Sequence, residues 1–262
     1  MPVRLRAAAV SDAGAHRATN QDAAFAASWG AAVADGVGGG PSGDLASAAL
    51  VHRLVATSGG GLDADGLLVR IREANWDIRA HVERDPALEG MATTFTGIFL
   101  SVSGELLLAH TGDSRAYLLR EGEFTRETRD DSYVQALVDH GIIPPEAAQA
   151  HPRRNIITAS LGGAEGDVVS VAERPPLVGD RWMLCSDGLT DYVPEADVAR
   201  LIAEAPDAHS AAASAVALAL EAGTRDNVTV VVCDVVDEDA EGREPVFFGS
   251  AARWFAEDVE TA

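Results

Sequence analysis

The feature that most constrains this 262-residue chain is a set of short apolar segments that meet an aspartate at a glycine or a tight turn. The segments read VADG, HTGDS, LCSDG and TRDN, and their aspartates are Asp35, Asp113, Asp187 and Asp226. Apolar runs of this length are typical of buried strands. A carboxylate beside a buried strand loses hydration, and a bound cation is a common way to offset that cost. Asp-Gly alone is foremost a turn signal, but four such carboxylates from distant positions predict one discontinuous site that the fold assembles.

The hydrophobic pattern mixes strands and helices without strict alternation. Strands are predicted at residues 3–10, 22–28, 30–34, 93–102, 105–110, 114–120, 167–172, 181–186 and 227–236, and helices at 44–57, 63–84, 195–203 and 209–222. Residues 130–163 combine short helical pieces, Pro144-Pro145 and the polar stretch HPRRN, so we interpret them as a flap outside the sheet core. This order predicts an α+β fold with helices outside two sheets.

A change of composition divides the chain near residue 236. Residues 1–236 are expected to form one domain, whereas residues 237–262 are acidic and aperiodic, and are expected to be a partly ordered tail or a docking peptide. Cys185 and Cys233 lack a metal-type spacing and are expected to be buried thiols. The apolar stretch near the N-terminus is too short for a signal peptide, and no run approaches the ~20 residues of a membrane span. We therefore expect a cytoplasmic protein.

The charge balance limits both partners and cofactors. With 20 Lys and Arg against 41 Asp and Glu, the formal net charge is −21, which repels nucleic-acid phosphates and anionic lipid. No HExxH or clustered Cys/His pattern indicates zinc, and no G-x-S-x-G indicates a serine hydrolase. The segment GVGGGPSG lacks the lysine of a P-loop and matches a dinucleotide motif poorly. Four carboxylates instead favour hard cations such as Mg²⁺ and Mn²⁺.

Seven blocks along the chain together match a known family. They read SDAGAHRATNQD, VADGVGG, MATTFTG, HTGDSRAYLL, HPRRNIITASLGG, LCSDGLTDYV and GTRDNVTVVV. Through them, from about residue 5 to 236, the chain resembles the PPM family, the protein phosphatase 2C type of metal-dependent serine/threonine phosphatases, in its compact bacterial form. The resemblance implies a central antiparallel β-sandwich flanked by α-helices, with a two-ion Mn²⁺ or Mg²⁺ site at one end. It also implies that a metal-bridging hydroxide attacks the phosphorus of phosphoserine or phosphothreonine.

The resemblance also implies roles for the metal-site residues. Asp35 falls on the aspartate that bridges the two metals, and Gly36 falls on the glycine whose carbonyl ligates the second metal. Asp187 and Asp226 fall on the other aspartates of the pair site. Asp113 falls on the aspartate that is linked, together with Asp187, to a third metal.

Two further roles and one gap follow from the same blocks. Asp22 falls on the acidic residue that holds a metal-bound water, and Arg17 falls on the arginine that grips the substrate phosphate. A guanidinium suits that role because it can donate to two phosphoryl oxygens at once. Val37 stands where animal relatives carry a histidine proposed as general acid, so the general acid is unassigned. A metal-bound water is the first candidate, while His110 is interpreted as a satisfied strand histidine.

Three other positions depart from the family pattern without removing a metal ligand. The chain has Gly39-Gly40-Pro41, Asp130-Asp131-Ser132 and Ala92-Thr93-Thr94 where many members have Gly-Gly-His, Asp-His-Ser and Gly-Thr-Thr. Two alternatives to a phosphatase that opposes a bacterial Ser/Thr kinase stay open at this point. One is a non-catalytic regulator that binds phosphopeptides, and the other is a sigma-factor-pathway phosphatase of the same superfamily. The presence of Arg17 and all the pair-site aspartates favours an enzyme, expected to be a monomer acting on phosphoproteins.

Overall fold

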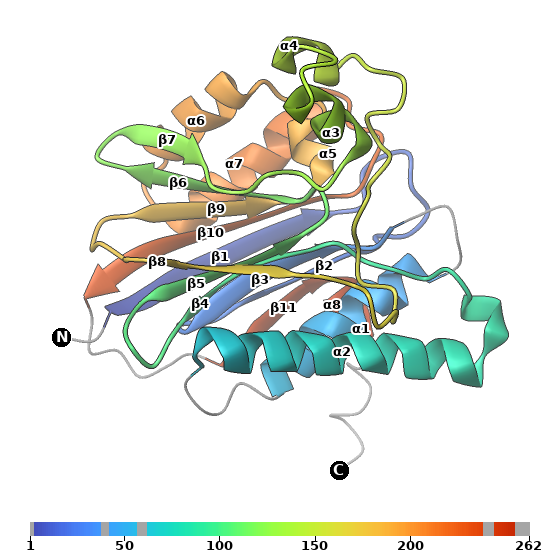
Figure 1. The fold of residues 1–262 in the computed structure, drawn as a ribbon. Coiled ribbons are helices and arrows are strands. Elements are labelled where there is room, and N and C mark those ends of the chain that lie inside the picture. The colour runs from blue at the N-terminus through green and yellow to red at the C-terminus, as the bar shows by residue number, and fades with distance from the viewer. Residues whose placement is uncertain (1–2, 38–41, 57–61, 238–243, 255–262) are drawn as a thin grey trace.

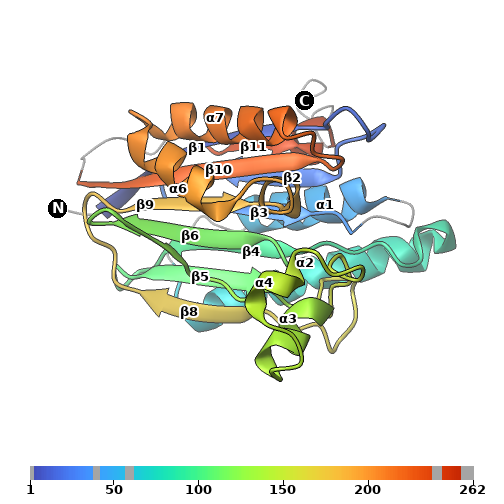
Figure 2. The same ribbon diagram turned by 90° about the horizontal axis from the view of Figure 1, so that it is seen from above.

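The structure is a computed structural model that describes residues 3–37, 42–56, 62–237 and 244–254. Residues 38–41 of the glycine-rich segment and the end of the tail (255–262, with Phe255) lie outside the described residues. Two antiparallel sheets face each other, and helices cover both outer faces (Figure 1). Seen from above, α6 and α7 lie over one sheet, while α1 and α2 lie on the other side of the sandwich (Figure 2). This arrangement confirms the predicted α+β sandwich.

The first sheet has the strand order β1-β10-β9-β6-β7, with every pair antiparallel. Its longest pairing joins the two ends of the domain, since β1 and β10 are in register from Val3 opposite Asp237 to Asp12 opposite Val228. Valines dominate β10, and branched side chains pack well on a pleated surface. The strands are β1 (Val3–Asp12), β6 (Arg115–Arg120), β7 (Glu123–Arg126), β9 (Arg181–Cys185) and β10 (Val228–Asp237).

The second sheet has the order β11-β2-β3-β4-β5-β8, again antiparallel throughout. Strands β2 to β5 are almost entirely buried, because one face meets the other sheet and the opposite face meets helices. Its strands are β2 (Asp22–Ala26), β3 (Gly30–Asp35), β4 (Phe95–Leu100), β5 (Leu106–Thr111), β8 (Ser170–Arg174) and β11 (Val246–Gly249).

Helix boundaries follow local capping signals. Helix α2 begins after Asp63, whose side chain accepts a hydrogen bond from the Gly66 amide, and it ends at Asp85, which precedes a proline. Asp207 caps α7 in the same way through the Ser210 amide. The long helices are α1 (Gly43–Ala56), α2 (Ala64–Arg84), α6 (Glu195–Glu204) and α7 (Ala208–Glu221). The short ones are η1 (Pro86–Leu88), α3 (Tyr133–Asp139), α4 (Pro145–Ala148), α5 (Asp187–Thr190) and α8 (Ser250–Arg253).

Three apolar layers hold the sandwich together. The middle layer lies between the sheets and contains Trp182, Leu184 and Ile98, all fully buried. The outer layers pack α1 and α2 on the second sheet and α6 and α7 on the first. Both cysteines are buried, unpaired thiols, as expected from the sequence. Within the described ranges, none of the helices is both long and apolar enough to cross a membrane.

Three differences from the expected elements concern the sheets and the tail. Strand β7 is not expected from the sequence, because its four residues are too few to give a clear alternating pattern. The strand expected at 167–172 lies instead at β8 (Ser170–Arg174). Asp167 belongs to the preceding loop, because its carboxylate accepts hydrogen bonds from the amides of Gly162 and Ala164. The tail contributes β11 and α8, which pack on β2 and α1. Residues 130–163 contain α3 and α4, while their motion as a flap and the domain limits stay predictions.

Candidate active site

The sheet topology brings the predicted carboxylates to one end of the sandwich. Asp22 begins β2 and Asp35 ends β3, and antiparallel pairing places them directly opposite each other. Asp113 follows β5, Asp187 follows β9 and Asp226 precedes β10. Within each sheet, antiparallel pairing brings the start of one strand beside the end of the next. The two sheets face each other, so the five positions meet at one end of the sandwich. The predicted discontinuous grouping of aspartates is therefore present in the fold.

A small cavity lies where these strand ends meet. Its volume is about 130 Å³, and its walls include Arg17, Asp35, Gly36, Asp113, Asp187 and Asp226. Asp22 lies behind it, where its carboxylate accepts a hydrogen bond from Ser186 Oγ at 2.8 Å. Six of the seven site residues expected from the sequence thus line one cavity. The seventh, Asp22, is buried next to it.

Two threonines fix the end of β3. The amide of Asp35 donates to Thr94 Oγ1 at 3.0 Å, and the Asp35 carbonyl accepts from the Thr94 amide at 2.8 Å and from Thr93 Oγ1 at 3.0 Å. Thr94 Oγ1 also lies 2.8 Å from Ser114 Oγ, next to Asp113. The MATTFTG block therefore fixes the backbone that carries Asp35 and links it to Asp113.

Close backbone contacts explain two glycines beside the aspartates. A Cβ on Gly36 would lie 2.3 Å from the Gly43 carbonyl oxygen and 2.7 Å from that of Gln21. A Cβ on Gly188 would lie 1.9 Å from the Asn227 carbonyl oxygen. Only glycine fits these positions without a backbone shift. The Asp-Gly pairs that first read as turn signals thus let the strand ends approach one another.

Asn227 fastens the N-terminal loop to the site, and sequence reasoning missed it. Its Nδ2 donates to the carbonyls of Ala13 and Thr19 at 2.9 and 3.0 Å, and its Oδ1 accepts from the Gln21 amide at 2.8 Å. The only signal for it was a polar side chain immediately before the apolar run of β10. Through Asn227 the SDAGAHRATNQD block wraps around the turn that carries Asp226.

Arg17 lies at the mouth of the cavity. Its Nη2 donates to Asp226 Oδ2 at 2.7 Å, and its side chain is 40% exposed. The guanidinium therefore combines access to solvent with a position beside the carboxylates. An anion that enters the cavity here would lie beside the Arg17 guanidinium.

The crowded carboxylates shift one another's protonation. Burial raises the pKa of Asp35 and of Asp187 well above the usual value, and repulsion from neighbouring carboxylates adds to the effect. Burial also raises the pKa of Asp22 to about 6 and that of Asp113 to about 7. These shifts mark an excess of negative charge that positive charge would relieve.

The residues fit hard divalent cations. Asp187 Oδ1 is buried and accepts no hydrogen bond from any described residue, so an oxygen ligand is left over beside the cavity. In the described part of the chain, no three His, Cys, Asp or Glu side chains already stand close enough to hold one ion. The donor set around the cavity is nevertheless all oxygen, which is the set that Mg²⁺ and Mn²⁺ prefer. Asp35, Asp113, Asp187, Asp226 and the Gly36 carbonyl are the groups that would hold them.

The raised pKa of Asp113 predicts a pH-dependent stability of the chelator-treated protein. A carboxyl group whose pKa is raised on folding contributes stability that is fully present below its usual value near 3.8 and is lost as the pH rises through about 7. In EDTA, the urea midpoint of the wild type is expected to fall more between pH 4.5 and 7.5 than that of Asp113→Asn, which cannot titrate there. Equal falls for the two proteins would contradict the shift.

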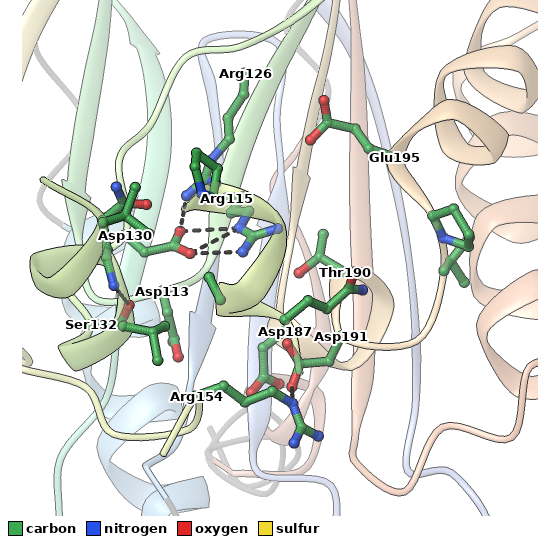
Figure 3. A pocket seen from close by; sticks show the side chains of 18 of the residues that line it. Asp113, Arg115, Arg126, Asp130, Ser132, Arg154, Asp187, Thr190, Asp191 and Glu195 are labelled. Atoms are coloured by element: carbon green, nitrogen blue, oxygen red, sulfur yellow. Dashed lines mark hydrogen bonds and ion pairs between the residues drawn. The ribbon is translucent and has the colours of Figure 1, made fainter. Parts of the chain in front are cut away.

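A larger pocket of about 360 Å³ adjoins the carboxylates and shares Asp113 and Asp187 with the first (Figure 3). On its wall Arg115 and Arg126 both donate to Asp130, with an Arg115 Nη2 to Oδ2 distance of 2.7 Å. Arg154, from the predicted flap, donates to Asp191 at 3.2 Å. Sequence reasoning missed Asp191, although it stands one helical turn after Asp187. Helices α3 and α4 thus contribute residues to the wall of this pocket.

His110 has both ring nitrogens occupied. Nδ1 lies 3.0 Å from Thr96 Oγ1 and Nε2 lies 2.9 Å from the Arg129 carbonyl oxygen. Burial lowers its pKa, and it does not line the cavity of the aspartates. The interpretation of His110 as a satisfied strand histidine is confirmed.

Comparisons with known proteins agree with this geometry. A family model described as protein phosphatase 2C matches residues 14–221. The serine/threonine protein phosphatase PstP of Mycobacterium tuberculosis is 44% identical over 252 residues, which cover 95% of this chain and 48% of PstP. The chain therefore spans about half the length of that curated relative. The serine/threonine phosphatase stp of Listeria innocua is 35% identical over 213 residues, or 77% of this chain and 82% of that protein.

Solved structures give the same result. The crystal structure of the M. tuberculosis phosphatase PstP/Ppp matches with a TM-score of 0.83 at 42% identity, covering 89% of this chain and 100% of that one. The PstP catalytic domain in complex with two manganese ions matches with a TM-score of 0.81 at 42% identity, covering 90% and 100%. That relative holds the pair of ions that the sequence resemblance implies. In sequence, in fold and in the grouping of its strand-end aspartates, the chain belongs to the protein phosphatase 2C family.

Proposed function

We propose that the chain is a metal-dependent protein serine/threonine phosphatase that hydrolyses phosphoserine and phosphothreonine with two Mn²⁺ or Mg²⁺ ions. The observation that carries the proposal is the cavity in which Arg17 stands beside Asp35, Asp113, Asp187 and Asp226. A set of oxygen ligands next to an exposed guanidinium suits a phosphate monoester, because divalent cations held by those ligands and the guanidinium would both bind phosphoryl oxygens. The phosphatases of M. tuberculosis and L. innocua described above support this activity.

The mechanism divides between the carboxylates and the arginine. When bound, the ions supply a water of lowered pKa and positive charge for the phosphoryl oxygens. Asp35, Asp187 and Asp226 would hold those ions at fixed strand ends, where the threonines and glycines described above limit the movement of the carboxylates. Asp22, whose carboxylate accepts from Ser186 Oγ, would orient a water beside those ions. Arg17 donates to the phosphate at the mouth and holds it in line for attack.

An assay on matched phosphopeptides tests the proposal. The chain is expected to release phosphate from a phosphothreonine peptide in Mn²⁺, and to lose that activity in EDTA and regain it when Mn²⁺ is restored. The control is the same peptide with phosphotyrosine, which is expected to react far more slowly. Full hydrolysis after exhaustive chelation, or binding of the phosphothreonine peptide without turnover in Mn²⁺, would contradict the proposal, and the second result would favour a non-catalytic regulator.

The cellular setting of this activity is part of the proposal. Its substrates would be phosphoproteins made by a bacterial-type Ser/Thr kinase, in the cytoplasm, with the chain acting as a monomer. The buried unpaired thiols of Cys185 and Cys233 support a reducing compartment. The strongly acidic composition argues against nucleic acid or anionic membrane as a partner.

A further inference from the structure

The C-terminal segment reaches the back of the candidate active site. Residues 246–254, here named the C-terminal clasp, comprise β11 and α8. Strand β11 adds to the edge of β2, and its last pair places Gly249 opposite Ala23. The chain then turns toward the first residue of β2, which is Asp22. The family match ends at residue 221, so the clasp lies outside it.

Two buried hydroxyl groups join the clasp to the peptide units of Gln21 and Asp22. Ser47 Oγ, from α1, donates to the Gln21 carbonyl at 2.6 Å. Ser250 Oγ, from α8, lies 3.0 Å from the Asp22 carbonyl oxygen and 2.9 Å from Ser47 Oγ. Both serines are fully buried. The two hydroxyls therefore lie within hydrogen-bond distance of each other and of two neighbouring carbonyls at the point where β2 begins.

Gly249 permits this approach. Its φ is +64°, in the left-handed region, and a Cβ there would lie 2.2 Å from the Asp22 carbonyl oxygen. Any side chain at this position would push the clasp away from Asp22. The junction between β11 and α8 is thus shaped to touch the backbone of a candidate site residue.

Several contacts seat the clasp on α1. The Phe247 ring stacks on His52 at a centroid distance of 4.1 Å, and His52 Nε2 lies 2.7 Å from the Ala251 carbonyl oxygen. Trp254 Nε1 donates to Asp44 Oδ2 at 3.1 Å. Asp44 follows Gly43, whose carbonyl packs against Gly36. The clasp therefore contacts the start of α1 as well as the start of β2, next to Gly36 and Gln21, which line the cavity.

We propose that the C-terminal clasp is a positioning element of the metal site, in which Ser250 and Ser47 hold the Gln21–Asp22 backbone and thereby set the affinity for divalent cations. Asp22 is held twice, by Ser186 at its carboxylate and by Ser250 at its carbonyl. The Gln21 carbonyl that Ser47 holds also accepts from the Gly36 amide at 3.2 Å. Release of the clasp would loosen both Asp22 and Gly36. The inference rests on the proposed metal site, but not on the substrate of the reaction.

Titration of Mn²⁺ into the chelator-treated full chain by calorimetry tests the inference. Ser250→Ala is expected to raise the Kd for Mn²⁺ on the order of tenfold, the effect that lost outer-shell partners typically have. Ser47→Ala is expected to do the same, and the double variant to lose little more than either, because the two hydroxyls act as one unit. At saturating Mn²⁺, the KM for a phosphothreonine peptide is expected to stay unchanged. A wild-type Kd in both single variants would overturn the inference.

Two controls separate positioning from general stability. Val246→Ala lies on the clasp with its side chain half exposed, and it is expected to leave the Kd unchanged. Ile202→Val removes a methylene from the core under α6, far from β2, and is expected to lower the unfolding temperature without changing the Kd. If Ile202→Val raised the Kd as much as Ser250→Ala, the clasp would be structural only.

The same experiment keeps the two proposals apart. Because the titration contains no phosphate ester, a chain that binds Mn²⁺ but hydrolyses nothing would refute the proposed function and leave the inference standing. A chain that hydrolyses phosphothreonine while Ser250→Ala and Ser47→Ala bind Mn²⁺ normally would refute the inference alone.

Discussion

Asp187→Asn is expected to lower kcat toward a phosphothreonine peptide on the order of 10³-fold in saturating Mn²⁺, which corresponds to several kcal/mol of transition-state stabilisation. Asp187 opens α5 directly after β9, and its side chain borders both cavities. An amide there would remove one negative charge from the ligand set. It would also place an NH₂ hydrogen-bond donor where the cations need an oxygen ligand. The measurement is steady-state kinetics over a range of Mn²⁺ concentrations.

The same substitution is expected to stabilise the chelator-treated protein. Burial and repulsion from Asp113 and Asp191 raise the pKa of Asp187, so its ionised form is costly without a cation. Asp187→Asn removes that cost, and its urea midpoint in EDTA at pH 7.5 is expected to exceed that of the wild type. Asp197→Asn, at a half-exposed carboxylate of α6 that pairs with Arg200, is the matched control and is expected to leave kcat unchanged and to shift the urea midpoint little. Near wild-type kcat in Asp187→Asn would remove this residue from the metal site.

The opposite effects on activity and stability reflect how the site is built. Asp22, Asp35, Asp113 and Asp187 are held close together by strand pairing within each sheet and by the apolar layer that packs the two sheets on each other. The fold thus maintains an arrangement that the carboxylates alone would avoid. This arrangement is typical of functional sites, which retain features that cost stability.

The sequence could predict the aspartates because each carries its own local signal. A carboxylate at the end of an apolar run is visible in single segments such as VADG and LCSDG. Antiparallel pairing brings the strand ends of each sheet together, and the packing of the two sheets brings the two sets to one end of the sandwich. The long elements are equally local, since α2 shows its period over its whole length and has Asp63 as its cap. These parts of the fold follow from neighbouring residues.

The parts that the sequence could not predict depend on distant partners. Strand β11 has four residues and becomes a strand through β2, more than 200 positions away. Asn227 gains its role from the carbonyls of Ala13 and Thr19, which no local pattern connects to it. The contact between Ser47 and Ser250 could not be predicted from the sequence for the same reason, because a serine in an alanine-rich helix carries no local signal of a distant partner. Hydrogen bonds between residues distant in sequence determine the structure at these positions, and the residues that form them show no hydrophobic periodicity.

Arg17→Ala is expected to lower kcat/KM toward the phosphothreonine peptide about 10- to 100-fold, because a hydrogen bond to a charged group contributes roughly 1.5–3 kcal/mol. The loss is expected to appear mainly in KM, with a smaller fall in kcat as the phosphate loses its alignment. Arg17→Lys retains the charge but not the two-pronged donor, and is expected to recover only part of the loss. Steady-state kinetics on both variants gives the comparison.

The contact between Arg17 and Asp226 raises a competing role that the same variants can separate. In the structure the guanidinium donates to that carboxylate at 2.7 Å, so Arg17 could serve a metal ligand instead of the phosphate. A phosphate-gripping arginine predicts that Arg17→Ala weakens product inhibition by inorganic phosphate while the Kd for Mn²⁺ stays within a few-fold of the wild type. An arginine that only orients Asp226 predicts the reverse, with a changed Kd for Mn²⁺ and unchanged inhibition by phosphate. Because Arg17 is half exposed at the mouth and the aspartates lie deeper, we expect the first result.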